Sequence, residues 1–361
     1  MTATSDVLII GGGVIGLAIA VELKLRGASV TVLSRDFQAA ASHAAAGMLA
    51  PLAEALPPGP MLDLCKRSRE LYHDWTRKLE DLTGEPTGYW PCGILAPVYT
   101  QLEHPGCSDR NGYDVQETWL DRDAINLYQP GLGSDVVGGW WYPEDAQVDN
   151  RSLVGALWTV AQSLGVDVRD QITVEVIQQQ QRQVIGVQTS SGVISAEHYV
   201  LATGAWSNEL LPSPVRPKKG QMLSVQVPEH SLPDLERILF APDIYIVPRR
   251  DGRIVIGATS EDVGFTPQNT PSGIQALLER AIRLYPQLQH YPIQEFWWGF
   301  RPATPDELPI LGTSPYKNLT LATGHYRNGI LLAPVTASLI ADLIWEQKSD
   351  SLLAHFNYSR F

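Results

Sequence analysis

The sequence predicts an α/β fold in which a nucleotide-binding domain is interrupted by a second, mostly β domain. Three observations lead to this prediction: a strand–helix–strand pattern at the N-terminus, strand-like patterns over 84–144 and 222–295, and a last buried strand and helix after residue 319. With 361 residues, the chain is too long for one ordinary core and long enough for two domains.

The N-terminal pattern begins with Val7–Ile10, a short apolar run that stops at three glycines and therefore predicts a buried strand. Apolar residues at helical spacing over 14–26 predict a helix, which Gly27 closes. A second strand is predicted over Val30–Leu33. Together these elements form a βαβ unit.

A glycine motif, Gly11-x-Gly13-x-x-Gly16, lies between this first strand and its helix. Gly11 permits the tight turn, Gly13 lets the backbone approach a pyrophosphate, and Gly16 lets the helix pack on the strand. The helix N-terminus then offers free N–H groups and the positive end of its dipole to the anion. Because strand, motif and helix follow in the required order, the motif predicts a bound dinucleotide.

The end of the second strand leaves the identity of this dinucleotide open. An acid that binds the ribose hydroxyls is expected there. Ser34 occupies that position, and Asp36 follows two residues later. Arg35 favours a 2′-phosphate and hence NADP if it binds the ligand, but it is equally compatible with packing over the adenine or facing solvent. The motif alone does not separate FAD, NAD and NADP.

The rest of the chain supplies the remaining elements of both domains. Leu201-Ala-Thr-Gly204 recurs as Leu321-Ala-Thr-Gly324, in each case after a buried strand, which predicts two places where backbone passes close to a ligand. Helices are predicted over 61–83, 151–164, 274–284 and 328–345, short strands over 167–193, and buried strands over 199–202 and 319–322.

Composition narrows the class of protein. A formal net charge of −12 argues against nucleic acid or an anionic membrane as a partner. The cysteines, Cys65, Cys92 and Cys107, have no CxxC spacing, and no histidine set completes a metal site. We expect reduced thiols, no metal and a cytoplasmic location, since residues 7–21 make a poor signal peptide and a worse membrane span.

Four further segments carry a resemblance to a known family: 42–49, 244–248, 298–302 and 324–332. With the glycine motif, they resemble the D-amino acid oxidase superfamily of FAD-dependent oxidoreductases, and within it the glycine oxidases of thiamine biosynthesis. The resemblance extends over essentially the whole chain in the right order. It implies a Rossmann-type, glutathione-reductase-like FAD-binding domain with an inserted, antiparallel-β-rich substrate domain. The expected domains are 1–84, 145–220 and 300–361 for FAD, and 85–144 and 221–299 for substrate.

The resemblance also implies which residues hold the cofactor. FAD is expected to bind non-covalently, because none of the cysteines lies in a segment assigned to the flavin. The loop from His325 to Leu331 is expected to cover the pyrimidine edge of the flavin. The implied cofactor residues are Gly11, Gly13, Val14, Ile15, Gly16, Ser34, Arg35, Ser42, Ala46, Gly47, Met48, Val174, His325, Tyr326, Arg327, Asn328, Gly329, Ile330 and Leu331.

Three residues are implied at the substrate: Arg301 holds its carboxylate, with Tyr245 and Arg327 beside it. Arg301 lies in an apolar sequence, where a bidentate pair with a carboxylate is strong. Alternatively Arg301 forms a structural ion pair with Asp306 or Glu307, Tyr245 is a core tyrosine, and Arg327 binds phosphate or forms a surface ion pair. Departures from the glycine oxidase pattern at Ser260 and Asp243 leave the substrate open.

This set contains few groups that could act as an obligate general base, and His325 is the one obvious candidate. The scarcity favours direct hydride transfer from the substrate Cα to flavin N5, with the amine entering neutral. The product is then an imine, which hydrolyses to glyoxylate or a 2-oxo acid and ammonia or passes to a thiazole synthase. Oxygen takes the electrons and becomes hydrogen peroxide.

Other functions remain open from the sequence. Within flavoenzymes these are a D-amino acid oxidase, a sarcosine oxidase and a quinone-linked amino acid dehydrogenase. From other classes, an NADP-dependent reductase is favoured only by Arg35, and a flavin-bound sensor would not consume oxygen. The family further implies a homotetramer.

Overall fold

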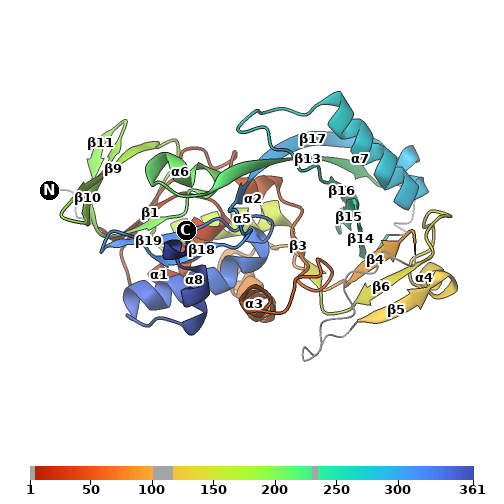
Figure 1. The fold of residues 1–361 in the computed structure, drawn as a ribbon, viewed down its shortest axis with the longest axis horizontal. Helices are drawn as coiled ribbons and strands as arrows, with labels where there is room; N and C mark the ends of the chain where they lie inside the picture. Colours follow the sequence, from red (N-terminus) through yellow and green to blue (C-terminus); the bar gives the residue numbers. More distant parts are fainter. Residues whose placement is uncertain (1–4, 101–116, 230–234) are drawn as a thin grey trace.

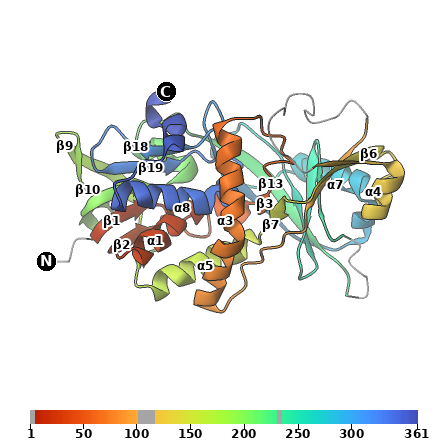
Figure 2. The same ribbon diagram turned by 90° about the horizontal axis from the view of Figure 1, so that it is seen from below.

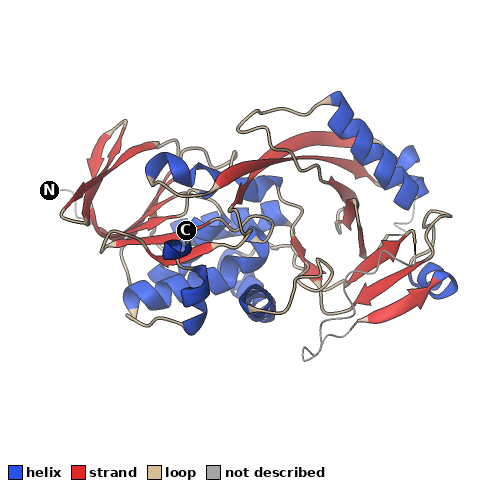
Figure 3. Cartoon of the chain, in the orientation of Figure 1, coloured by secondary structure: helices blue, strands red, loops and turns tan. Residues whose placement is uncertain are grey.

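The computed structural model describes residues 5–100, 117–229 and 235–361. Figure 1 shows two units side by side: one holds the N-terminal elements together with α8, and the other holds the long strands β13 and β17 with α7. Figure 3 shows that most helices gather in the first unit, while strands dominate the second. Segments far apart in the sequence therefore build each unit.

The first unit is organised by a six-stranded sheet in the order β18-β19-β12-β1-β2-β8. All neighbouring strands run parallel except β18 and β19, which are antiparallel. This is the nucleotide-binding sheet that the sequence predicts. Its strands are β1 (Ser5–Ile10), β2 (Val30–Leu33), β8 (Asp167–Arg169), β12 (Ala196–Leu201), β18 (Ile310–Thr313) and β19 (Leu319–Thr323).

Helices cover one face of this sheet, as Figure 2 shows. Helices α1 and α8 are apolar on nearly every side, because each lies between the sheet and further helices. Helix α3 packs across α8 with one apolar stripe. The predicted helices are confirmed to within three residues at their ends: α1 (Val14–Leu25), α3 (Pro60–Thr83), α5 (Asn150–Ser163), α7 (Pro271–Leu284) and α8 (Gly329–Trp345).

The opposite face of the sheet packs on a small antiparallel sheet of β9 (Val174–Gln180), β10 (Gln183–Thr189) and β11 (Gly192–Ile194). Successive side chains of β1 point to opposite faces of the sheet and so belong to two different cores. Val7 and Ile9 belong to the core shared with the helices, and Leu8 and Ile10 to the core shared with β9 and β10.

The second unit contains an eight-stranded sheet in the order β17-β13-β16-β15-β14-β4-β6-β5, antiparallel except between β4 and β14. This confirms the predicted β-rich insert. Strands β13 and β17 both continue across the predicted domain limits at 220 and 300, and the division itself stays a prediction. The strands are β4 (Ile94–Val98), β5 (Thr118–Asp121), β6 (Gly138–Tyr142), β13 (Arg216–Gln226), β14 (Ile238–Ala241), β15 (Ile244–Pro248), β16 (Arg253–Gly257) and β17 (Ile293–Ala303).

Short elements complete the fold, and none of them was predicted from the sequence. Strand β3 (Met48–Leu49) pairs with β7 (Ala146–Gln147), and the helices α2 (Ala41–Ala44), α4 (Arg122–Tyr128) and α6 (Ser207–Leu210) each span two turns or fewer. After Trp345, Leu353 and Phe356 return to the helical core. No helix within 5–100, 117–229 or 235–361 has the length and apolar character needed to cross a membrane.

Candidate functional site

A single continuous cavity extends from the first sheet into the second unit. On one side it is lined at the carboxyl ends of β1, β2, β12 and β19. On the other side it reaches β13, β15 and β17. Ligands of parallel α/β sheets bind at the carboxyl ends of the strands. Both Leu-Ala-Thr-Gly strand ends lie here, through Ala202–Gly204 and through Ala322 and Thr323.

The glycine motif forms the turn between β1 and α1. Gly11 has φ of +120°, and a Cβ there would lie 2.3 Å from the Ala202 oxygen. A Cβ at Gly16 would lie 1.9 Å from the Gly11 oxygen, so Gly16 serves helix packing and does not line the cavity. Gly13 does line it, at the uncapped N-terminus of α1. That helix end is therefore available to an anion.

An orphaned hydroxyl marks the same region. The Ser42 side-chain oxygen is buried and, among the described residues, has no hydrogen-bond partner. Ser42 lines the cavity, and its Oγ would lie 3.8 Å from a Cβ at Gly13. A buried hydroxyl without a partner is costly, and a phosphate oxygen would satisfy it. The residues present therefore fit the pyrophosphate of a dinucleotide.

The ribose end differs from the usual acid-bearing pattern. Ser34 is buried and lines the cavity, and its hydroxyl hydrogen-bonds the carboxylate of Asp170. Arg35 also lines the cavity, and its guanidinium lies 2.6 Å from the Glu209 carboxylate at the surface. Arg35 is thus an exposed side chain that forms a surface ion pair.

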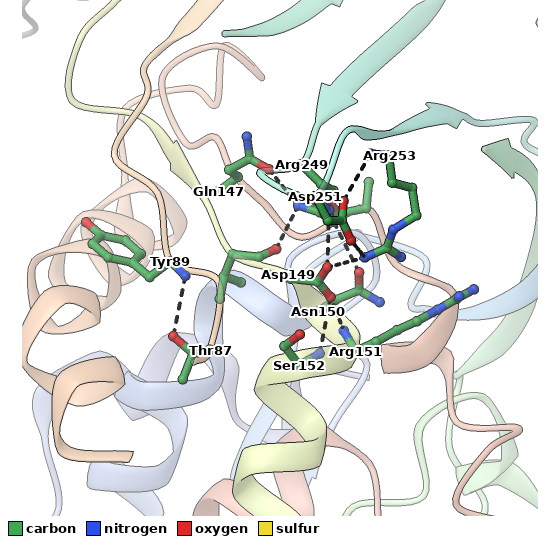
Figure 4. A network of polar contacts seen from close by, with 12 residues as sticks. Thr87, Tyr89, Gln147, Asp149, Asn150, Arg151, Ser152, Arg249, Asp251 and Arg253 are labelled. Atoms are coloured by element: carbon green, nitrogen blue, oxygen red, sulfur yellow. Dashed lines mark hydrogen bonds and ion pairs between the residues drawn. The ribbon is translucent and has the colours of Figure 1, made fainter. Parts of the chain in front are cut away.

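The loop of small residues after α2 is held by a buried arginine from the second unit, Arg249, which Figure 4 shows beside Gln147 and Asn150. Arg249 follows β15, and its Nη2 donates to the Ala46 oxygen at 2.8 Å. Its Nη1 donates to Gln147 Oε1 at 2.6 Å and to the Val148 oxygen at 3.1 Å. Burial lowers the Arg249 pKa to about 10, opposed by Asp149, so the side chain stays charged at neutral pH.

The C-terminal loop closes the cavity at the start of α8. His325 is buried, and its Nε2 lies 3.2 Å from Thr336 Oγ1. Burial lowers the pKa of His325 to about 3, so the imidazole is neutral. Its Nε2 is hydrogen-bonded to Thr336, a residue of α8. Of the predicted cofactor residues, all line the cavity except Gly16, Asn328 and Leu331, which belong to the backbone packing around α1 and α8.

The three predicted substrate residues, Tyr245, Arg301 and Arg327, all line this one cavity. Arg301 Nη1 donates to the Thr259 oxygen at 3.0 Å, and among the described residues Arg301 forms no ion pair. The alternative pairing with Asp306 is wrong, because Asp306 is held by Arg360 at 2.8 Å. The charge of Arg301 therefore remains available to a ligand.

Tyr245 and Arg327 line the cavity together with Arg301, and we call this part of the cavity the cationic chamber. Burial raises the pKa of Tyr245, although the Arg301 guanidinium works in the opposite direction, so its hydroxyl stays protonated. That hydroxyl lies 3.5 Å from Met222 Sδ, a weak partner, and it also hydrogen-bonds the Arg301 side chain. The Arg327 guanidinium lies 5.4 Å from the ring centre of Tyr326 and, within the described residues, has no ion pair.

One charged residue of the cavity was missed from the sequence. Glu54 lines the chamber with Tyr245 and the two arginines. It belongs to no motif, and its one signal is that it is the only charged side chain between His43 and Asp63. Met222, Phe240 and Phe300 supply apolar walls that were also not predicted.

The two positions at which the sequence departs from the glycine oxidase pattern lie elsewhere. Ser260 is exposed, and Asp243 pairs with Arg280 at 3.3 Å on the surface. Neither lines the cavity. These two departures therefore do not change the residues that line the cavity.

A cavity that fits a dinucleotide and continues into a second unit is the arrangement of a dinucleotide-dependent oxidoreductase. The chain belongs to the DAO family of FAD-dependent oxidoreductases, whose profile matches residues 6–343. The cofactor is therefore FAD, which decides between the dinucleotides that the glycine motif left open. Cys65 and Cys92 lie outside the cavity lining, while Cys107 is outside the described residues.

Individual relatives agree with this family. The chain is 71% identical over 360 residues to the bifunctional protein ThiO/ThiG of Nostoc sp. strain PCC 7120, which covers 99% of this chain and 55% of that protein. The glycine oxidase of Bacillus licheniformis is 34% identical, with 94% of this chain and 92% of that protein covered. The crystal structure of glycine oxidase from Geobacillus kaustophilus has a TM-score of 0.92 and 34% identity over 99% of both chains.

The bifunctional relatives are much longer than the sequence described here. The chain spans about half the length of these curated relatives, 55% in the Nostoc protein. Within the described residues, no group of three or more His, Cys, Asp or Glu side chains is arranged to hold a metal ion.

Proposed function

We propose that this chain oxidises the Cα–N bond of glycine and small D-amino acids with FAD. The observation that carries the proposal is the chamber itself: Tyr245, Arg301 and Arg327 line the same cavity as the residues that fit the dinucleotide. The relatives named glycine oxidase, which match nearly the whole chain, support the same substrate.

Arg301 has the chemistry required for the substrate carboxylate. Its guanidinium is anchored through one N–H to a neutral carbonyl, that of Thr259, which leaves further donors and the full charge for a bidentate pair. A Cβ at Gly220 would lie 2.5 Å from Arg301 Nη2, so the glycine provides the space that this side chain occupies. The hydroxyl of Tyr245 is protonated and can donate a second hydrogen bond to the same carboxylate.

The cavity residues around Gly13 and Ser42 would hold FAD, which would supply a hydride acceptor for the substrate Cα and a route for the electrons to oxygen. The chain's residues bind and orient the amino acid and exclude water around the Cα. For glycine the product imine hydrolyses to glyoxylate and ammonia, and the oxygen becomes hydrogen peroxide. The bifunctional relatives support a thiazole synthase as the partner that takes the imine. A homotetramer and a cytoplasmic location stay predictions.

Oxygen uptake by the purified flavoprotein tests this function, with glycine, sarcosine, D-alanine, D-proline and L-alanine as substrates. We expect uptake and peroxide with glycine and the small D-amino acids, and none with L-alanine. Reduction of an artificial acceptor without oxygen uptake would instead identify a dehydrogenase. If neither oxygen uptake nor reduction of the artificial acceptor occurs, the proposal that this chain oxidises amino acids is wrong.

A further inference from the structure

The substrate chamber contains one carboxyl group that no part of the protein uses. Among the described residues, two acids line the cavity, Asp36 and Glu54. Asp36 accepts hydrogen bonds from the backbone N–H groups of Gln38 and Ala39 at 3.0 and 3.1 Å, which occupies it in a local turn. The Glu54 carboxyl, by contrast, forms no hydrogen bond or ion pair with any described residue.

The turn that carries Glu54 is fixed by a buried network. The carboxylate of Asp145 accepts hydrogen bonds from the backbone N–H groups of Ala53 at 2.8 Å and Leu52 at 3.2 Å. Asp145 is fully buried, and Arg69 Nη1 pairs with it at 3.1 Å. These contacts hold the two residues directly before Glu54, so the fold sets the backbone position from which its side chain enters the cavity lining.

The surroundings of Glu54 allow it to carry or release a proton. Burial raises its pKa, while Arg327 and Arg301 act to lower it. The titratable and charged groups that interact with it electrostatically are Arg301 of β17, Tyr245 of β15, Cys65 of α3, and Arg327 and Glu307 of the C-terminal loops.

An amino acid brings two charges into this chamber. The arginines satisfy the carboxylate, but the ammonium would be buried without a partner, which is costly. Since Asp36 is occupied, Glu54 is the one acid of the described lining that remains for it.

We propose that Glu54 binds the substrate's amino group and takes one proton from it. In this step one N–H bond of the ammonium breaks, the proton passes to a carboxyl oxygen of Glu54, and the electron pair stays on nitrogen. A neutral amine and a neutral carboxylic acid result, with no change in oxidation state. The inference rests on the proposed function and adds to it the residue that recognises and neutralises the nitrogen.

Binding of two matched ligands tests the recognition. Cyclopropanecarboxylate and 1-aminocyclopropanecarboxylate differ only in that an amino group replaces the hydrogen on C1. The amino ligand therefore has no Cα hydrogen to transfer, and the other ligand has no amine to oxidise. Their affinities for the FAD-loaded protein can be followed by the change in flavin absorbance. In Glu54→Gln we expect the affinity for the amino ligand to fall about tenfold or more, the scale of losing one charge-assisted contact. The affinity for cyclopropanecarboxylate should change by less than roughly threefold.

Glu70→Gln is the matched control, because Glu70 is exposed on α3, outside the cavity. It makes the same chemical change and should leave both affinities unaltered. FAD content and the thermal unfolding midpoint of each variant establish that Glu54→Gln is folded, which we expect because the Glu54 side chain has no internal partner to lose. Glu54→Asp should recover part of the amino-ligand affinity.

The proton transfer has its own readout in the pH dependence of kcat/KM. Without Glu54, only the neutral fraction of free glycine can react, so the Glu54→Gln deficit at pH 7 should diminish as pH rises towards the ammonium pKa. A deficit that is constant with pH would overturn the proton transfer. Equal losses for both cyclopropane ligands, or no loss for either, would overturn the recognition. If the wild-type protein oxidises no amino acid, the proposed function fails, while the ligand comparison still decides the role of Glu54.

Discussion

At the scale of single residues, the site depends on charges that the fold leaves without internal partners. Arg301 is held by the carbonyl of Thr259, and that residue is fixed in turn by neighbours on β13. The backbone N–H of Gln221 donates to Thr259 Oγ1 at 2.9 Å, and Glu261, which accepts from the Thr259 hydroxyl, lies 3.4 Å from the buried ammonium of Lys219. This arrangement positions a guanidinium without neutralising it, as expected of a ligand-binding group.

Replacing Arg301 by alanine should remove the partner of the substrate carboxylate and leave FAD bound. We expect kcat/KM for glycine to fall by an amount equivalent to roughly 3–5 kcal/mol of binding free energy, which is the cost of leaving one buried charge without its partner. Steady-state kinetics and the flavin-to-protein absorbance ratio measure the two quantities. Arg280→Ala, on the outer surface, is the control. An unchanged KM for glycine would remove Arg301 from the substrate site.

At the scale of elements, the two units are joined where β15 ends beside the loop of small residues. Arg249 donates to four backbone or side-chain oxygens across this junction, those of Ala46, Gln147, Val148 and Asn150. Figure 4 shows Arg249 with Gln147 and Asn150. Asn150, at the start of α5, continues the junction by donating to the Ser42 oxygen at 2.7 Å. The strand that carries Tyr245 is thus tied to α2, which carries Ser42, and to the loop after it, which carries Ala46.

Arg249→Met should therefore weaken both the fold and cofactor binding. The buried oxygens of Ala46, Gln147 and Val148 would lose their donor, for which we expect a decrease of about 2–5 kcal/mol in the free energy of unfolding. Urea unfolding and the FAD dissociation constant, from flavin fluorescence, measure the two effects. Arg250→Met is the adjacent control, since that residue is exposed and lies over the Trp90 ring. If Arg249→Met loses no more stability than the control, the junction does not depend on this side chain.

At the scale of the whole molecule, burial of neutral histidines makes stability depend on pH. Burial lowers the pKa of His198 to about 4 and that of His325 to about 3, from an ordinary value of 6.5. Below pH 6.5 the unfolded chain therefore binds protons that the folded protein does not. The free energy of unfolding must fall as pH decreases from 6.5 through these values.

His198 offers the cleaner test, because it pairs with Thr320 at 2.8 Å in the sheet and does not line the cavity. In His198→Asn we expect a smaller loss of stability than in the wild type between pH 7 and pH 5. Urea unfolding at both pH values gives the comparison, and His73→Asn, at an exposed position, is the control. A pH dependence equal to that of the wild type would show that His198 contributes none of it.

The regular elements could be predicted because their signals are local. Helix α3 was expected over 61–83 and spans Pro60–Thr83, and Val30–Leu33 was expected and found as β2. Both depend on periodicity within a few turns or residues. The strands β3 and β7 have two residues each, too few for any period, and form only because residues 48 and 147 meet in space.

By itself, the sequence determined the local elements of the nucleotide-binding half of this protein: the glycine turn, the helix that follows it and the buried strands at 7–10, 30–33, 199–202 and 319–322. Only the tertiary structure decided which charges face the substrate. It pairs Asp306 with Arg360 and leaves Arg301 unpaired, buries His325 as a neutral group, and brings Glu54 to the arginines. The physical reason is that backbone geometry follows from neighbouring residues, whereas the partner and burial of a charged side chain depend on contacts with other elements, as between Asp306 and Arg360, 54 positions apart.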